Sequence, residues 1–94
     1  MTDGARLRFL LDLAESLGVD VRRMPAGDRP EDVTRAGGDL VRLRGRDILF
    51  LDPRAAVTDR LAAVAAALAG RRELADRFLP PEIRVLLNGA DDTP

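Results

Sequence analysis

The chain contains no histidine, cysteine, lysine, tyrosine or tryptophan, and all 15 of its basic residues are arginine. Without histidine, Ser-His-Asp catalysis and histidine-ligated zinc are excluded, and without lysine so are Schiff-base chemistry and the P-loop lysine. Without cysteine there are no disulfides or thiolate metal sites, which favours a cytoplasmic location. Catalysis would have to rest on acids, arginine, Ser16, threonine or an oxygen-ligated metal. We therefore expect a protein that is not an enzyme and holds no cofactor.

Pairs of neighbouring carboxylates leave one class of enzyme open, a carboxylate- or magnesium-dependent activity. Asp12 and Glu15 share one face of a predicted helix, and Glu31–Asp32 and Asp91–Asp92 are adjacent. The sequence places no neighbouring group that would raise a carboxyl pKa or complete a metal site. Solvated surface is the favoured interpretation of these acids.

Length and charge indicate one small domain with no strong electrostatic preference for a partner. The chain has 94 residues, of which 46% are hydrophobic, and a formal net charge of −1. The N-terminus does not resemble a secretory signal, and the longest weakly polar run is too short to span a bilayer. We expect a single domain over residues 1–94, with frayed ends at about 1–4 and 90–94 and no membrane contact.

Apolar spacing predicts a first helix over residues 5–17, ended by Gly18. Its main stripe consists of Leu7, Leu10, Leu11, Ala14 and Leu17. Phe9 and Leu13 form a second apolar strip beside it. The two interpretations of this second strip are that it packs inside the same core or that it contacts another subunit.

Alternating side chains predict a strand over residues 19–24 and a hairpin over residues 39–52, with a turn at 44–47. Between them, residues 25–38 are expected to form a mobile loop that has weak signs of one helical turn. The second hairpin strand is apolar on both faces, with Ile48 and Phe50 on one face and Leu49 and Leu51 on the other. Strands of this kind are normally covered on both sides, so a second copy of the chain is expected to supply the missing cover.

An alanine-rich helix is predicted to follow the hairpin and to end at Gly70. Asp52–Pro53 is its expected start, and Thr58 is a rival N-cap. A short helix through Leu79 is expected next, with Leu74 and Phe78 directed inward. Pro80–Pro81 should break it and start a final helix that stops at Asn88–Gly89.

These elements predict an α+β domain. We expect a small antiparallel sheet of about three strands, packed by the N-terminal helix and the alanine-rich helix, with short C-terminal helices. The predicted function is a non-catalytic protein-interaction module that pairs with itself or with another protein. Its candidate dimer contacts are Phe9, Leu13, Ile48 and Phe50.

The alternative function is binding of nucleic acid or another anion by a group of arginines. Arg42, Arg44 and Arg46 lie on the hairpin, and Arg22 lies on the strand before it. Guanidinium groups pair with phosphates in a bidentate way, but nucleic-acid readers on sheets usually add aromatic stacking. We favour a solvated sheet face whose arginines pair with Asp20, Asp39 and Asp47, so nucleic acid is the less favoured partner.

The order of elements from Leu11 to Leu68, with "LGVDVRRM", "LVRLRGRDILFLD" and "DRLAAVAAALA", resembles the central part of the ImmA/IrrE-type zinc metallopeptidases. Setting Arg60–Leu61 against the Arg-aromatic step of that family places Ala65, Ala66 and Ala69 at the positions of its H-E-x-x-H motif. The resemblance therefore implies a metal-free relative that kept the scaffold. It also motivates the hypothesis that the chain regulates active metallopeptidases by pairing with them.

A second resemblance is to short uncharacterised bacterial proteins that carry "GG-x-x-x-R-x-R-G" and "PP-x-x-R". The matching residues here are Gly37, Gly38, Arg42, Arg44, Gly45, Pro80, Pro81 and Arg84. This resemblance implies an architecture and no particular chemistry.

Overall fold

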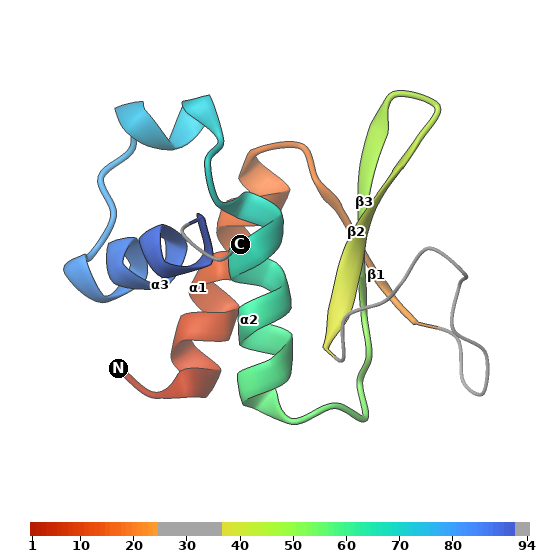
Figure 1. The fold of residues 1–94 in the computed structure, drawn as a ribbon, viewed down its shortest axis with the longest axis horizontal. Helices are drawn as coiled ribbons and strands as arrows, with labels where there is room; N and C mark the ends of the chain where they lie inside the picture. The colour runs from red at the N-terminus through yellow and green to blue at the C-terminus, as the bar shows by residue number, and fades with distance from the viewer. Residues whose placement is uncertain (25–36, 92–94) are drawn as a thin grey trace.

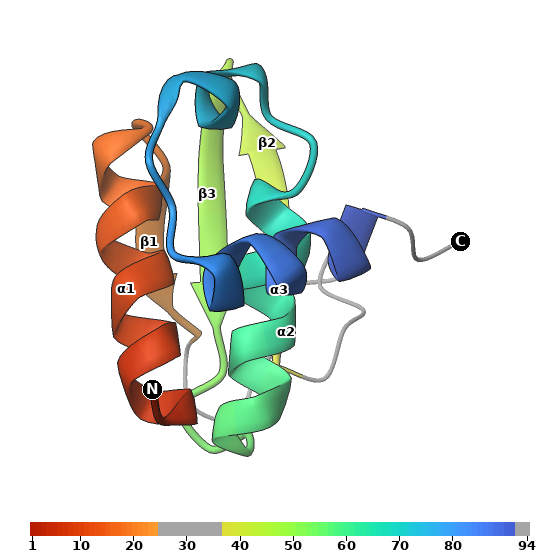
Figure 2. The same cartoon turned by 90° about the vertical axis from the view of Figure 1, so that its left-hand side faces the viewer.

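A computed structural model of the chain describes residues 1–24 and 37–91. Their elements, in order, are α1 (Asp3–Ser16), β1 (Asp20–Arg23), β2 (Gly38–Leu43), β3 (Arg46–Leu51), α2 (Val57–Leu68), the 3₁₀ helix η1 (Arg72–Asp76) and α3 (Pro81–Asp91). The α+β class expected from the sequence is confirmed. Figure 1 shows the helices on one side of the sheet, and Figure 2 shows α3 lying across α1 and α2 on the side away from the strands.

The sheet has three strands in the order β1-β3-β2. β2 pairs with β3 in antiparallel fashion, but β1 pairs with β3 in parallel, so the expectation of an antiparallel sheet is wrong for this strand. β1 and β2 are the two edges of the sheet, so the hairpin places β3 between them. There β3 runs antiparallel to β2 and parallel to β1. The central position gives β3 a hydrogen-bonded neighbour along each of its two edges.

The turn of the hairpin consists of Arg44 and Gly45, with φ angles of 53° and 77°. Two consecutive positive φ angles are the geometry of a two-residue type I′ turn, which matches the twist of the flanking strands. β2 therefore ends at Leu43 and β3 begins at Arg46, so the turn is shorter than the expected 44–47.

A loop was expected over residues 25–38. Residues 25–36 lie outside the described residues, and β2 already begins at Gly38. Gly37 lies against the first turn of α2, where a Cβ atom would collide with the backbone carbonyl of Asp59. The Gly37 carbonyl also accepts a hydrogen bond of 3.0 Å from the Asp52 N–H. Glycine at position 37 thus lets the start of the hairpin approach α2 closely.

Two helix starts differ from the expected ones. α1 begins at Asp3, inside the end that was expected to be frayed, because the Thr2 hydroxyl accepts a 3.1 Å hydrogen bond from the Ala5 N–H. α2 begins at Val57 with Ala56 as its N-cap, so neither Asp52 nor Thr58 caps it. The Asp52 carboxylate instead accepts a 2.9 Å hydrogen bond from the Arg54 N–H and closes a local turn.

The C-terminal part differs in two ways. α3 continues to Asp91, past the expected stop at Asn88–Gly89 and into the expected frayed end. η1 ends at Asp76, and the chain is extended at Arg77, so the short helix expected through Leu79 is present but ends three residues earlier. In extended backbone neighbouring side chains point in opposite directions, and Leu79 is buried while Phe78 is 92% exposed. The inward position expected for Phe78 is wrong, whereas the one expected for Leu74 is confirmed.

A single core joins the helices to one face of the sheet. Its largest fully buried side chains are Leu10, Leu49, Val64, Leu68 and Ile83. They come from α1, β3, α2 and α3, so every layer contributes to the core.

Candidate functional site

Strand register assigns each side chain of the sheet to one of two faces. Leu49 is fully buried in the core, so residues that share its face point toward the helices. We call the other side the open face, and the register places on it Asp20, Arg22, Asp39, Val41, Leu43, Arg46, Ile48 and Phe50. No helix in the described part of the chain covers the open face (Figure 1).

The four candidate anion-binding arginines do not share a surface. Arg22 and Arg46 lie on the open face, Arg42 lies on the opposite face across from Asp47, and Arg44 lies in the turn. In addition, β1 and β2 are the two edges of the sheet, so Arg22 is separated from Arg42 by β3.

Two of these arginines form the ion pairs that a solvated sheet face would have. An Arg22 nitrogen lies 2.8 Å from the Asp20 carboxylate, and the Arg42 Nε lies 3.9 Å from that of Asp47. Asp47 has a closer partner that the sequence pattern did not suggest, since Arg71 Nη2 donates to it at 2.9 Å. Arg71 follows α2, and only the tertiary fold brings it to the hairpin.

The candidate dimer contacts on α1 are occupied by the chain's own core. Leu13 is 6% exposed and belongs to the core, so its assignment as a dimer contact is wrong. Phe9 is half-buried and packs against the same core. The alternative interpretation, that this strip packs within the domain, holds for both side chains because α1 turns them toward its own neighbours.

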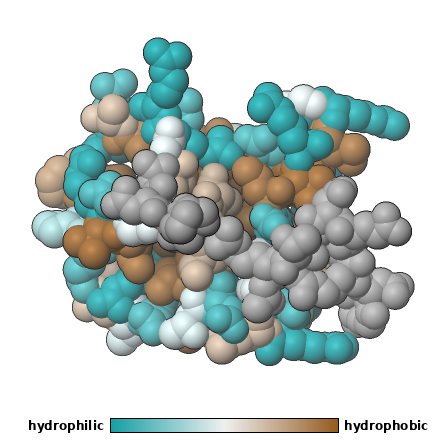
Figure 3. All heavy atoms as spheres, viewed as in Figure 1, coloured by the Kyte–Doolittle hydropathy of each residue, from teal (hydrophilic) through white to brown (hydrophobic). Residues whose placement is uncertain are grey.

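The candidate contacts on the sheet lie on the open face. Ile48 is 6% exposed within the single chain and offers little area to a partner, whereas Phe50 is half-buried. Val41, directly across from Ile48, is also half-buried, and Leu43 at the end of β2 is 55% exposed. The alternation in β2 placed Val41 and Leu43 on one side, but the sequence did not show that this was the side away from the helices. Figure 3 shows apolar surface over the sheet, on the right, as well as over the helices.

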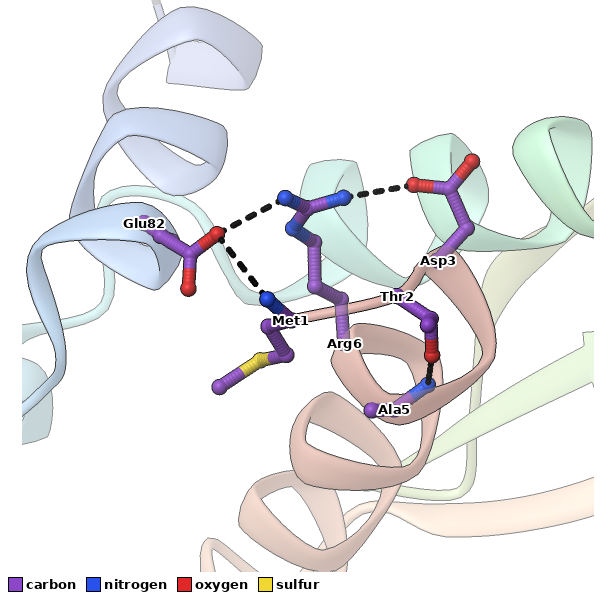
Figure 4. A network of polar contacts seen from close by, with 6 residues as sticks. All are labelled: Met1, Thr2, Asp3, Ala5, Arg6 and Glu82. Atoms are coloured by element: carbon purple, nitrogen blue, oxygen red, sulfur yellow. Dashed lines mark hydrogen bonds and ion pairs between the residues drawn. The ribbon is translucent and has the colours of Figure 1, made fainter.

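A charged network joins α1 to α3 (Figure 4). The Arg6 guanidinium donates to Glu82 at 2.7 Å and to Asp3 at 2.8 Å, and the Met1 amino group lies 3.7 Å from Glu82. The hydrogen bond from Arg6 lowers the pKa of Glu82, and the hydrogen bond to Glu82 raises the pKa of Arg6. The network is exposed, and it fastens the start of α3 to the start of α1.

The positions aligned with the H-E-x-x-H motif lie on α2 and directly after it. Ala65 is 3% exposed and part of the core, and Ala66 and Ala69 are half-buried. Side chains this small let α1 and the sheet approach α2 from both sides.

Within the described ranges, no group of three or more acidic side chains is placed to hold a metal ion. None of the helices described is both long enough and apolar enough to cross a membrane. Comparison of the chain with protein-family models, with curated proteins and with solved structures found no match.

Proposed function

We propose that this protein is a non-catalytic interaction module and that its partner is a second copy of the same chain, bound through the open face. The observation that carries the proposal is the exposed apolar area of Val41, Leu43 and Phe50 on the side of the sheet that no described helix covers. A contact with another protein surface would remove this area from water.

The charges of the open face support a second copy as the partner. The face carries Asp20 and Asp39 as well as Arg22 and Arg46, so positive and negative groups are equal in number. In a two-fold contact the same surface serves both subunits and must complement itself. A face with balanced charges around an apolar centre can do so, whereas a face of one sign would repel its copy.

The experiment is sedimentation equilibrium of the purified chain at micromolar concentrations, with Leu43→Glu as the test variant. We expect the wild-type chain to dimerise and Leu43→Glu to weaken dimerisation at least about tenfold, because a carboxylate within the contact would be desolvated. Val85→Glu is the matched control, since Val85 is an exposed valine (71%) on α3, away from the open face. A wild-type chain that stays monomeric, or equal weakening by both variants, would overturn the proposal.

A further inference from the structure

A pocket of about 210 Å³ lies where the end of α2, η1 and α3 meet, on the helical side of the molecule. It is lined by Gly70, Arg71, Leu74, Ala75, Leu79, Arg84, Leu87 and Asn88. None of these residues belongs to the open face, so what binds here is independent of the proposed dimer contact.

The apolar part of the lining is formed by three leucine side chains that belong to the core, together with the exposed Ala75. Leu74, Leu79 and Leu87 are 8%, 4% and 5% exposed, and they come from η1, the link after it and α3. Because the three elements are joined through the core, this surface is formed before any ligand arrives. Because each leucine is almost fully buried, it offers a short apolar chain only a small area of contact, but at little cost in conformational entropy.

The polar part of the lining is positively charged. Arg71 and Arg84 contribute guanidinium groups, Asn88 contributes an amide, and no acidic side chain is among the described residues that line the pocket. Arg71 is held in place because its Nε donates to the Ala67 carbonyl at 3.1 Å and its Nη2 donates to Asp47. Asp47 balances much of the charge of Arg71.

Arg84 differs from Arg71 because its charge has no counterion among the described residues. Its Nη2 donates to the Arg77 carbonyl at 3.0 Å, and no carboxylate of the described chain lies within 4.0 Å of its guanidinium. The hydrogen bond to a carbonyl orients the guanidinium and leaves its remaining N–H groups available to an anion.

The size of the pocket limits the ligand. Its volume is below the roughly 300–1,000 Å³ of sites for drug-sized ligands, which favours a small ligand. From this size, the leucine surface and the unpaired charge of Arg84, we infer that the pocket binds a small carboxylate with a short apolar chain. The carboxylate pairs with Arg84 and Asn88, and the apolar chain lies on the three leucines. Such a group is supplied either by a free short-chain acid or by the C-terminus of a peptide that ends in an apolar residue.

The test is a titration of the ¹⁵N-labelled chain, followed by the backbone amide shifts of the lining residues. Hexanoate represents the free acid, N-acetyl-leucine represents a peptide C-terminus, and hexanamide is the neutral counterpart of hexanoate. We expect saturable shifts with at least one carboxylate, and at least about tenfold weaker binding of hexanamide, because it cannot pair with Arg84. Tighter binding of N-acetyl-leucine than of hexanoate would assign the site to a chain terminus, and the reverse order would assign it to a free acid.

Variants of Arg84 distinguish binding of a carboxylate in this pocket from a general attraction of carboxylates to exposed arginines. Arg84→Gln should weaken carboxylate binding at least about tenfold, and Arg84→Lys should restore part of it. Arg72→Gln is the matched control, because Arg72 is an exposed arginine of η1 that does not line the pocket. Thermal unfolding of each variant verifies that it is folded. Absence of saturable shifts, equal binding of hexanoate and hexanamide, or equal loss in Arg84→Gln and Arg72→Gln would overturn the inference and leave the dimer proposal untouched.

Discussion

Neighbouring residues can differ completely in burial, and Phe78 and Leu79 are the clearest example. Helical spacing from Leu74 predicts Phe78 inside, because four residues make about one turn. The chain leaves η1 after Asp76 and becomes extended at Arg77, so the next two side chains diverge. What decides the outcome is the end of a helix, which single-sequence patterns specify poorly.

The free energy of unfolding should separate these two residues. Phe78→Ser should change it by no more than about 0.5 kcal/mol, because the ring is 92% exposed and loses no core contacts. Leu79→Ala should lower it by about 2–5 kcal/mol, because Leu79 is 4% exposed and its truncation leaves a cavity. Urea unfolding followed by circular dichroism measures both values. The inward packing expected from the sequence would instead make Phe78→Ser the more damaging substitution.

At the scale of elements, local signals predicted several boundaries correctly and missed others, and the direction of a distant strand was not predicted. The helix ends at Gly18 and Gly70 were predicted from the sequence, and both glycines have positive φ angles, 84° and 76°. The hairpin was found from its alternation and its turn, which are also local. The start of α2 was missed because the Asp52 carboxylate can cap a turn as well as a helix, and in the structure it caps a turn. The parallel direction of β1 depends on how the chain crosses the sheet, which no local pattern contains.

For the candidate site too, the side chains that share a face of one strand could be predicted, whereas the neighbours of that strand could not. Alternation identified the apolar side chains of β3, and the structure places Ile48 and Phe50 on one face as expected. The grouping of Arg22 with Arg42 failed because it assumed that their strands were neighbours, whereas β3 lies between them. Of the two arginines that line the pocket, Arg71 carries no sequence signal beyond its charge, and Arg84 appears only in the PP-x-x-R pattern, which implies no chemistry. Only the packing of η1 and α3 brings them together. Likewise, the resemblance to the ImmA/IrrE scaffold stays a prediction.

The attachment of α3 to α1 should depend on pH through Glu82. Because Arg6 lowers the pKa of Glu82 below its ordinary value of 4.5 in the folded state, the ionised carboxylate stabilises the fold. This contribution is complete above the ordinary pKa and is lost as the pH falls through the lowered one. We therefore expect Glu82→Gln to have a lower Tm than the wild-type chain at neutral pH, and the difference should close in acid.

Glu73→Gln is the control for this experiment, because Glu73 is an exposed glutamate that makes no ion pair among the described residues. Its Tm should follow that of the wild-type chain at every pH. If the difference between Glu82→Gln and the wild-type chain stayed constant from neutral pH into acid, the network in Figure 4 would have no part in fastening α3.

The whole molecule consists of three layers that differ in how they are held. α1 and α2 pack against each other and against the sheet, so the middle layer is covered on two sides. α3 packs mainly against α2 and has no described element on its outer side. An outer layer with contacts on one side opens at a lower free-energy cost than a central one. This matters for the pocket, because α3 contributes Arg84, Leu87 and Asn88 to its lining.

Native-state hydrogen exchange should show that amides of α3 are less protected than amides of α2 and β3. We expect the amides of Val64 and Leu49, in α2 and in the central strand β3, to exchange only through global unfolding, because both side chains are fully buried in the core. The amide of Leu87 in α3 should exchange at least about tenfold faster and should respond little to low urea concentrations, as local opening does. Hexanoate should slow the exchange of Leu87 if the pocket binds it, since binding to the closed form stabilises α3. Equal protection of all three amides would mean that α3 unfolds only together with the rest, and that the pocket persists as long as the domain is folded.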